Sequence, residues 1–198
     1  MNFVLKWRGL FIGVLFGWLS SGVIFAQTND TPEYDVKGAF LCNLAKFVEW
    51  PTNTFSSPNA PLLIGIYGQN TFSNNLAEFT YGKSIEGHRV VVRKISFNEL
   101  GQCQVLFIGE SKQSKLNTIL RKLNDSPVLT VTEEVDPFKS GIMINFTEQS
   151  GQIRFEINTH AARRAGLKIS SKLLNLAIKT DVSLGNEKPD EQLCARLP

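Results

Sequence analysis

Residues 141–158, "GIMINFTEQSGQIRFEIN", decide the fold. The run 142–146 is mostly apolar, apolar and polar residues alternate over 153–157, and a polar turn at 148–151 separates the two runs. This pattern predicts a β-hairpin. Strands that alternate with helices along the rest of the chain, followed by a late antiparallel hairpin, predict an α/β single-domain sandwich with a mixed sheet flanked by helices.

The remaining elements follow from short apolar runs and from helical spacing of apolar residues. The apolar runs typical of buried strands are 61–68, 103–111 and 127–133, with one strand or a strand pair expected within 84–95. Segments with helical spacing are 35–50, 70–79, 112–123, 159–165 and 169–179. We expect Pro51 to stop the first helix, Asn158 to cap the fourth helix and Gly166 to end it.

The beginning of the chain has the pattern of a secretory signal peptide. Lys6 and Arg8 precede an apolar run, which is followed by Ala26. The run is slightly shorter than the ~20 residues that span a bilayer, so we favour cleavage after Ala26 over an uncleaved anchor. The chain then divides into a signal peptide (1–26), an α/β domain (27–180) and a polar C-terminal tail (181–198), and we expect a periplasmic protein.

Removal of the signal peptide also changes the charge. The whole sequence has 21 basic and 18 acidic residues. Without Lys6 and Arg8 the mature chain has 19 basic residues and a net charge of +1. A nearly neutral chain lacks the electrostatic footprint of a nucleic-acid-binding protein, so we expect no nucleic-acid partner.

The three cysteines, Cys42, Cys103 and Cys194, are candidate redox residues. An exported protein folds where disulfides form, and an odd number leaves at least one thiol free or paired between chains. The sequence does not choose the pairing. It contains no CxxC motif, and His88 and His160 are far from any cysteine, so we expect no metal site and no cofactor.

The best candidate for an enzyme site is "FIGESKQSKL", residues 107–116. A buried strand runs through Gly-Glu-Ser into a helix, which is the outline of a nucleophile elbow around Ser111. Gln113 replaces the second glycine of that motif. Asp136 and His160 could follow as acid and base, but nothing ties them to Ser111. We therefore favour Ser111 as a helix cap and expect no catalytic residue.

Lys46, Glu49 and Trp50 are candidate ligand- or partner-binding residues near the end of the first predicted helix. A tryptophan before a proline often closes the bottom of a core, and this interpretation is favoured. It can equally form the wall of a ligand pocket, because an indole offers a large flat face and one hydrogen-bond donor.

A second group of candidates lies around the hairpin. Alternation places Arg154, Glu156 and Asn158 on one face of the second strand. Arg154 could pair with Glu156 or hold the carboxylate of a ligand, although a solvated face is slightly favoured. Arg163 and Arg164 most simply cover the outer side of the following helix.

Four separated stretches together resemble one protein family. They are "YDVKGAFLCNLAKFVEWP" (34–51), "CQVLFIGES" (103–111), "PVLTVTEEVDPFKSGIMINF" (127–146) and "GQIRFEINTHAARRAGLKISSKLLNLA" (151–177). In order and spacing they are similar to the YfiR-like (HmsC-like) family of exported bacterial proteins, over about residues 33–178.

The resemblance implies a regulator and not an enzyme. The type member of the family represses an inner-membrane diguanylate cyclase by binding its periplasmic sensor domain, and its release raises cyclic di-GMP and favours biofilm growth. The family implies a possible outer-membrane lipoprotein partner, a homodimer and control through disulfides. The alternative is a periplasmic sensor that binds a small molecule at Trp50 and has no cyclase partner.

One departure from the family puts the redox control in doubt. Members often have a cysteine where this chain has Gly65, and its usual mate corresponds to Cys103. The disulfide partners left for Cys103 are then Cys42 and Cys194. Arg154, Glu156 and Asn158 match the family, and our hypothesis is that they form a polar core of the hairpin. This core would fix the last helix, and the neighbouring surface would meet a partner or a small ligand.

Overall fold

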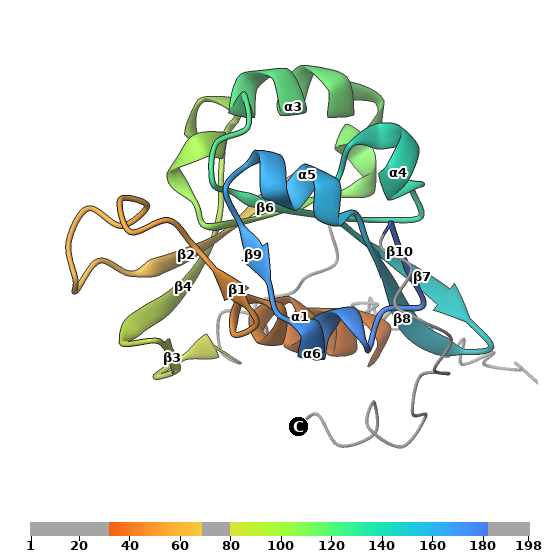
Figure 1. Cartoon of the computed structure of the whole chain (residues 1–198), viewed down its shortest axis with the longest axis horizontal. Helices are drawn as coiled ribbons and strands as arrows, with labels where there is room; N and C mark the ends of the chain where they lie inside the picture. Colours follow the sequence, from red (N-terminus) through yellow and green to blue (C-terminus); the bar gives the residue numbers. More distant parts are fainter. Residues whose placement is uncertain (1–31, 69–79, 182–198) are drawn as a thin grey trace, which may run out of the picture.

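The computed structural model describes residues 32–68 and 80–181, along which helices and strands alternate (Figure 1). The predicted signal peptide, the helix predicted at 70–79, Cys194 and all of the predicted tail after Asp181 lie outside the described residues. Within the described ranges, eight strands form one sheet in the order β10-β8-β7-β6-β5-β2-β4-β3. The described chain is a single α/β domain with a mixed sheet, as the sequence predicts.

The late hairpin is present and lies near one end of the strand order, next to β10. Strand β7 (Ile144–Gln149) pairs antiparallel with β8 (Gln152–Ile157), with Gln149 opposite Gln152. The two turn residues, Ser150 and Gly151, both have positive φ, at 53° and 75°. Such a two-residue left-handed turn matches the twist of the strands, so the strands continue closer to the turn than the polar sequence predicts.

The centre of the sheet is parallel. Strands β4, β2, β5, β6 and β7 run in one direction, and β3 and β8 run antiparallel to their neighbours in this set. Their bounds are β2 Leu62–Tyr67, β3 Ser84–Ile85, β4 His88–Lys94, β5 Val105–Ile108 and β6 Leu129–Glu133. The segment 84–95 is therefore a strand pair. We call the edge of the sheet where the parallel strands begin the amino edge.

Helices cover both faces of the sheet, giving two apolar cores. One core lies between the sheet and the helices α1 (Pro32–Ala45), α5 (Thr159–Arg164) and α6 (Ser171–Leu174). The other lies under η1 (Phe97–Gln102) and α3 (Leu116–Leu123), with η2 (Glu110–Lys115) leading into α3. The central strands are buried on both sides, which explains their nearly continuous apolar sequences.

The first helix ends earlier than predicted. It stops at Ala45, and the amides of Lys46 and Phe47 donate to carbonyls only three residues back, at 3.0 Å each, which tightens the last turn. The chain then extends into β1 (Val48–Glu49), which pairs with β9 (Lys168–Ile169). The prediction of a helix to Trp50 is wrong because this pairing offers the backbone an extended alternative, with a branched Val48 suited to it.

The last helix is also shorter than predicted. Asn158 caps α5, as expected, by accepting from the amide of Ala161 at 2.9 Å. Gly166 follows with φ of 73°. The segment 169–179 is helical only in α6, after which the amide of Ile178 donates to Phe155 at 3.0 Å and β10 (Lys179–Thr180) joins β8. Backbone hydrogen bonding of β10 to the open edge of β8 thus takes the place of the last part of the predicted helix.

A buried ion pair ties α1 to the sheet. Lys37 of α1 and Glu133 at the end of β6 contact each other, with side chains only 5% and 9% exposed. Phe40, one turn further, packs its ring against Phe146 and Phe155 at centroid distances of 6.3 and 6.0 Å. The helix is therefore held by one charged contact and one aromatic group.

Candidate functional site

Two candidate segments that are far apart in sequence lie side by side. Val48 and Glu49 pair with Ile169 and Lys168 in a separate two-stranded sheet. Lys168 Nζ lies 3.8 Å from Glu49 Oε2. We call the exposed residues of these segments, Lys46, Glu49, Gly166 and Lys168, the β1–β9 surface.

The close approach of the two segments needs a glycine. A Cβ atom on Gly166 would lie 3.2 Å from Cγ of Pro51, and Gly166 already has a left-handed backbone. A larger residue would therefore meet both steric crowding and backbone strain. The contact brings the end of α5 against the residue that follows Trp50.

Trp50 is half-buried and borders the core under α1 and α5. Its ring meets Phe55 edge-on at 6.5 Å, and Phe55 stacks on His88 at 3.8 Å. Trp50 Nε1 and Thr54 Oγ1 are buried atoms without a hydrogen-bond partner among the described residues. Unpaired buried donors are rare, so both earlier interpretations of Trp50 retain support: it packs on the core, and it has an unused donor.

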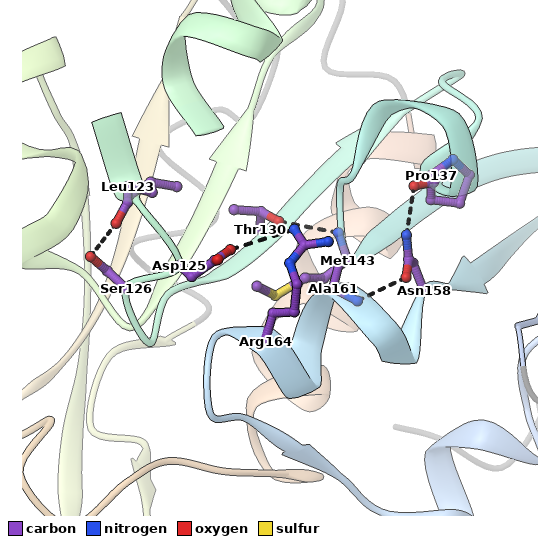
Figure 2. A network of polar contacts seen from close by, with 9 residues as sticks. All are labelled: Leu123, Asp125, Ser126, Thr130, Pro137, Met143, Asn158, Ala161 and Arg164. Atoms are coloured by element: carbon purple, nitrogen blue, oxygen red, sulfur yellow. Dashed lines mark hydrogen bonds and ion pairs between the residues drawn. The ribbon is translucent and has the colours of Figure 1, made fainter. Parts of the chain in front are cut away.

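Arg163 and Arg164 are exposed in the last turn of α5, where positive charge complements the helix dipole. Arg163 Nη1 donates back along the helix to Thr159 Oγ1 at 3.0 Å. Arg164 instead extends away from α5, and its Nη2 reaches Asp125 Oδ1 at 3.4 Å (Figure 2). The two arginines therefore contact different parts of the chain: Arg163 its own helix, and Arg164 the turn after α3.

The hairpin candidates take separate partners. Arg154 Nη2 donates to Gln152 Oε1 at 2.6 Å. Glu156 Oε2 accepts from Asn145 Nδ2 at 3.1 Å. Asn158, besides capping α5, donates from Nδ2 to the carbonyl of Pro137 at 2.9 Å (Figure 2). Phe155 and Ile157 point instead into the core under α1, α5 and α6, as alternation predicts.

Asn145 links the polar residues of the hairpin, and it is not among the candidates predicted from the sequence. Asn145 is only 3% exposed, lies directly opposite Glu156 in the hairpin register, and accepts from the amide of Val135 at 2.9 Å. It thus joins β7, β8 and the connection after β6. The signal available in the sequence was a polar residue inside the otherwise apolar run 142–146.

A pocket of about 270 Å³ lies at the amino edge, between the end of α3, the helix α5 and the beginnings of β6 and β7. Its lining consists of Leu120, Arg121, Leu123, Asn124, Asp125, Ser126, Val128, Thr130, Gly141, Met143, Ala161 and Arg164. Two of these lining residues, Arg164 and Asp125, contact each other (Figure 2). Of the candidates taken from the sequence, only Arg164 lines this pocket.

Asp181 occupies the beginning of α5. Its carboxylate accepts from the amide and hydroxyl of Thr159 at 2.8 and 2.7 Å and from the amide of His160 at 2.7 Å. Partial burial acts to raise the pKa of Asp181, but these hydrogen bonds outweigh it and lower the pKa below its usual value. The residue thus fixes the chain that follows β10 to α5.

The two described cysteines are buried and unpaired. Burial raises the pKa of Cys42 to about 11 and that of Cys103 to about 12, with smaller opposing effects from nearby lysines in the first case and hydrogen bonds in the second. Cys42 belongs to the core under α1 and Cys103 to the core under η1 and α3. The sheet separates them, so they do not pair with each other in this fold.

The structure does not bring Ser111, Asp136 and His160 together. Ser111 follows the carboxyl end of β5, whereas His160 follows β8, which ends at the amino edge. Asp136 caps α4 (Pro137–Ser140), its Oδ1 accepting from the amides of Phe138 and Lys139 at 2.9 and 3.2 Å. In η2, Ser111 is the second residue, and Gly109 stands at the capping position.

Within residues 32–68 and 80–181 no helix is long and apolar enough to cross a bilayer. In the same ranges no three side chains of the types His, Cys, Asp or Glu gather closely enough to hold a metal ion.

Comparison with known proteins gives one family match. Residues 34–178 match the family described as YfiR/HmsC-like, a span that begins within α1 and ends just before β10.

Solved structures give more distant matches. A conserved domain protein from Vibrio cholerae matches 73% of this chain and 60% of its own length, at 13% identity and a TM-score of 0.49. An ABC domain in complex with L-Trp from Streptococcus pneumonia matches 72% of this chain and 60% of its own length, at 14% identity and a TM-score of 0.50. The chain thus spans about 60% of these two structures, and the second likeness concerns the fold alone.

Proposed function

The chain belongs to the YfiR/HmsC-like family, and on that basis we propose that it is a periplasmic regulator that represses an inner-membrane diguanylate cyclase by binding the cyclase's periplasmic domain. The single observation that carries the proposal is the family match over residues 34–178, which includes the sheet up to β8, both cores and the β1–β9 surface. In this account the protein is a binding module and performs no chemistry.

Repression of this kind needs only differential affinity. A protein that binds the inactive state of a receptor more tightly than the active state shifts the receptor toward inactivity. A strong block corresponds to several kcal/mol of differential binding, on the order of 3–5. A ligand, sequestration by an outer-membrane lipoprotein, or formation of a homodimer could each change that affinity.

The β1–β9 surface and the adjacent end of α5 are the proposed partner-binding region. Lys46, Lys168, Arg163 and Arg164 are all exposed, and Glu49 is the acidic residue of the same group. Opposite charge steers association and excludes wrong partners. We therefore expect the partner surface to be acidic, and association to weaken as salt is added.

The test measures cyclic di-GMP in cells. Deletion of the gene should raise cyclic di-GMP, and the wild-type chain should restore the low level. The double variant Lys46→Glu/Lys168→Glu should reach the same protein level but fail to restore it. Lys94→Glu, a charge reversal at the exposed carboxyl end of β4, is the matched control and should restore it. Unchanged cyclic di-GMP after deletion would refute the proposal.

A second candidate is a periplasmic small-molecule sensor without a cyclase partner. The unpaired Nε1 of Trp50 and the adjacent aromatic stack of Phe55 on His88 favour it. The neighbouring genes discriminate at once: a membrane protein with a cyclase domain supports the regulator, whereas a transporter or histidine kinase supports the sensor.

A further inference from the structure

The pocket at the amino edge is small and is built from four separate elements. It lies where α3 and α5 both end, and its floor is formed at the starts of β6 and β7. Its volume of about 270 Å³ is just below the range of drug-sized sites, which begins at roughly 300 Å³. It therefore suits a ligand with a single small ring or a short chain.

Part of the pocket wall is apolar, and Thr130 contributes a hydroxyl at its floor. Leu123, Val128 and Met143 are nearly fully buried residues that line it. Thr130, 1% exposed, accepts at Oγ1 from the amide of Met143 at 3.1 Å. Among the described residues Thr130 Oγ1 donates to no acceptor, so a hydrogen-bond donor remains available beside the apolar walls.

The rim of the pocket carries more positive than negative charge. Arg121 and Arg164 line it together with one carboxylate, Asp125. The contact between Arg164 and Asp125 is long, at 3.4 Å, and the two side chains are 50% and 56% exposed. Such an exposed pair holds weakly, and a guanidinium has five donors, of which this contact uses one.

A left-handed turn places Asp125 on the rim. Asn124 and Asp125 both have left-handed φ, at 47° and 55°, a conformation that Asn and Asp adopt more readily than other non-glycine residues. Ser126 anchors the turn, because both its amide and its hydroxyl donate to the carbonyl of Leu123 (Figure 2). The turn thus fixes the backbone that carries the Asp125 carboxylate near Arg164.

We propose that this pocket binds a small organic carboxylate with an apolar body. The carboxylate takes the place of Asp125 on the guanidinium fork of Arg164, a geometry that suits two parallel hydrogen bonds. The apolar body fills the space between Leu123, Val128 and Met143. The inference concerns binding by this chain alone and requires no cyclase, so it stands or falls separately from the proposed regulation.

Three probes with the same ring test the charge preference: benzoate, neutral benzamide and cationic benzylamine. Each probe is titrated into the protein expressed from its full sequence, without a tag at the N-terminus, while the amide resonances are followed by NMR. Benzoate should shift the resonances of residues 123–126, 128–130, 143 and 161–164, and should bind about tenfold more tightly than benzamide because only benzoate carries a negative charge to pair with the guanidinium. Added salt should weaken benzoate alone.

Exposed variants assign the binding to Arg164. Arg164→Gln should reduce benzoate affinity to that of benzamide. Arg163→Gln is the matched control, because Arg163 is next to it on the same helix but bonds to Thr159, and it should leave benzoate binding unchanged. Asp125→Asn removes the competing carboxylate and should tighten benzoate binding several-fold.

Several results would overturn the inference. These are equal binding of the three probes, tighter binding of benzylamine, absence of benzoate binding at tens of millimolar, and equal loss in Arg163→Gln and Arg164→Gln. Because the substituted side chains are exposed, a folded variant is expected in each case, and the dispersion of the NMR spectrum verifies it.

Discussion

At the scale of single residues, the two described thiols should be inert in the native protein. Burial raises the pKa of Cys42 to about 11 and of Cys103 to about 12. At pH 8 the reactive thiolate of either residue is then about one part in a thousand or less. In a Cys194→Ser variant we expect alkylation by iodoacetamide to be slow without denaturant and to modify two thiols in denaturant.

The same experiment tests whether Cys42 and Cys103 form a disulfide with each other. A mass two units lower, with no free thiol in denaturant, would show a bridge between Cys42 and Cys103. It would contradict the placement of these residues on opposite sides of the sheet.

Asp181 should make stability depend on pH in a defined direction. Its hydrogen bonds from Thr159 and His160 outweigh burial and lower its pKa in the folded state below the ordinary value of 3.8. A carboxylate with a lowered pKa stabilises the fold above the unfolded-state pKa, and this contribution is lost as pH falls through the folded-state pKa. Asp181→Asn should therefore be less stable than wild type at pH 7, with the difference shrinking below about pH 4.

Urea unfolding at several pH values measures this difference. A constant difference between wild type and Asp181→Asn from pH 7 to pH 3 would show that the carboxylate charge contributes nothing.

Local roles could be predicted from sequence at this scale, and non-local roles could not. The cap formed by Asn158 depends only on the next three residues, and it is present. The partner of Glu156 depends on the hairpin register, which a two-residue turn sets. Because the turn was predicted to be longer, Asn145 was not recognised as that partner. The role of Asp181 depends on a chain reversal that no local pattern shows.

At the scale of elements, the ion pair between Lys37 and Glu133 should behave as a buried pair. Removing one partner leaves an unpaired buried charge, which costs about 3–5 kcal/mol, whereas replacing both by apolar residues is often neutral. Lys37→Met and Glu133→Met should each lower the free energy of unfolding by several kcal/mol, and the double variant should recover most of the loss. Urea unfolding measures each value.

An exposed ion pair provides the control. Arg93 and Glu99 contact at 2.7 Å with side chains 43% and 30% exposed, so Arg93→Met should cost no more than about 1 kcal/mol. Additive losses in the Lys37 and Glu133 variants would show that the two charges do not depend on each other.

The position of Gly65 on β2 offers a designed disulfide. A Cβ atom there would lie 3.2 Å from Cβ of Cys103, slightly closer than the ~3.5–4.5 Å of disulfides, and 2.6 Å from Cδ1 of Ile95. Gly65→Cys combined with Ile95→Val should therefore form a bridge on oxidation and raise stability by about 2 kcal/mol over its reduced form. Retention of both thiols after oxidation, by mass spectrometry, would contradict this geometry.

Element types were predictable where apolar patterns dominate, and their ends were not. The buried strands β2, β5 and β6 are present within the predicted runs. The helix predicted to reach Trp50 ends at Ala45, and the last helix gives way to β10. In both places the backbone bonds to a distant strand, β9 or β8, and such tertiary pairing overrides local propensity.

At the scale of the whole molecule, the fold brings together residues that the sequence keeps apart. The β1–β9 surface joins segments more than 100 residues apart, and Arg164 meets Asp125 across 39 positions. Sequence patterns predict the residues that each segment exposes, as for Lys46, Glu49 and Arg164, but not their neighbours. The candidate residues were thus recognisable one by one, and the surface and pocket that they form emerge only from the fold.

The central claim is that this protein binds a membrane cyclase. The most direct measurement retains the exported protein on a column, passes solubilised inner membranes over it under oxidising and reducing conditions, and identifies the bound proteins by mass spectrometry. The account predicts recovery of a diguanylate cyclase with a periplasmic domain by the wild-type chain and by Lys94→Glu, and its loss with Lys46→Glu/Lys168→Glu. If no cyclase is retained by the wild-type chain in either condition, the repressor mechanism is wrong.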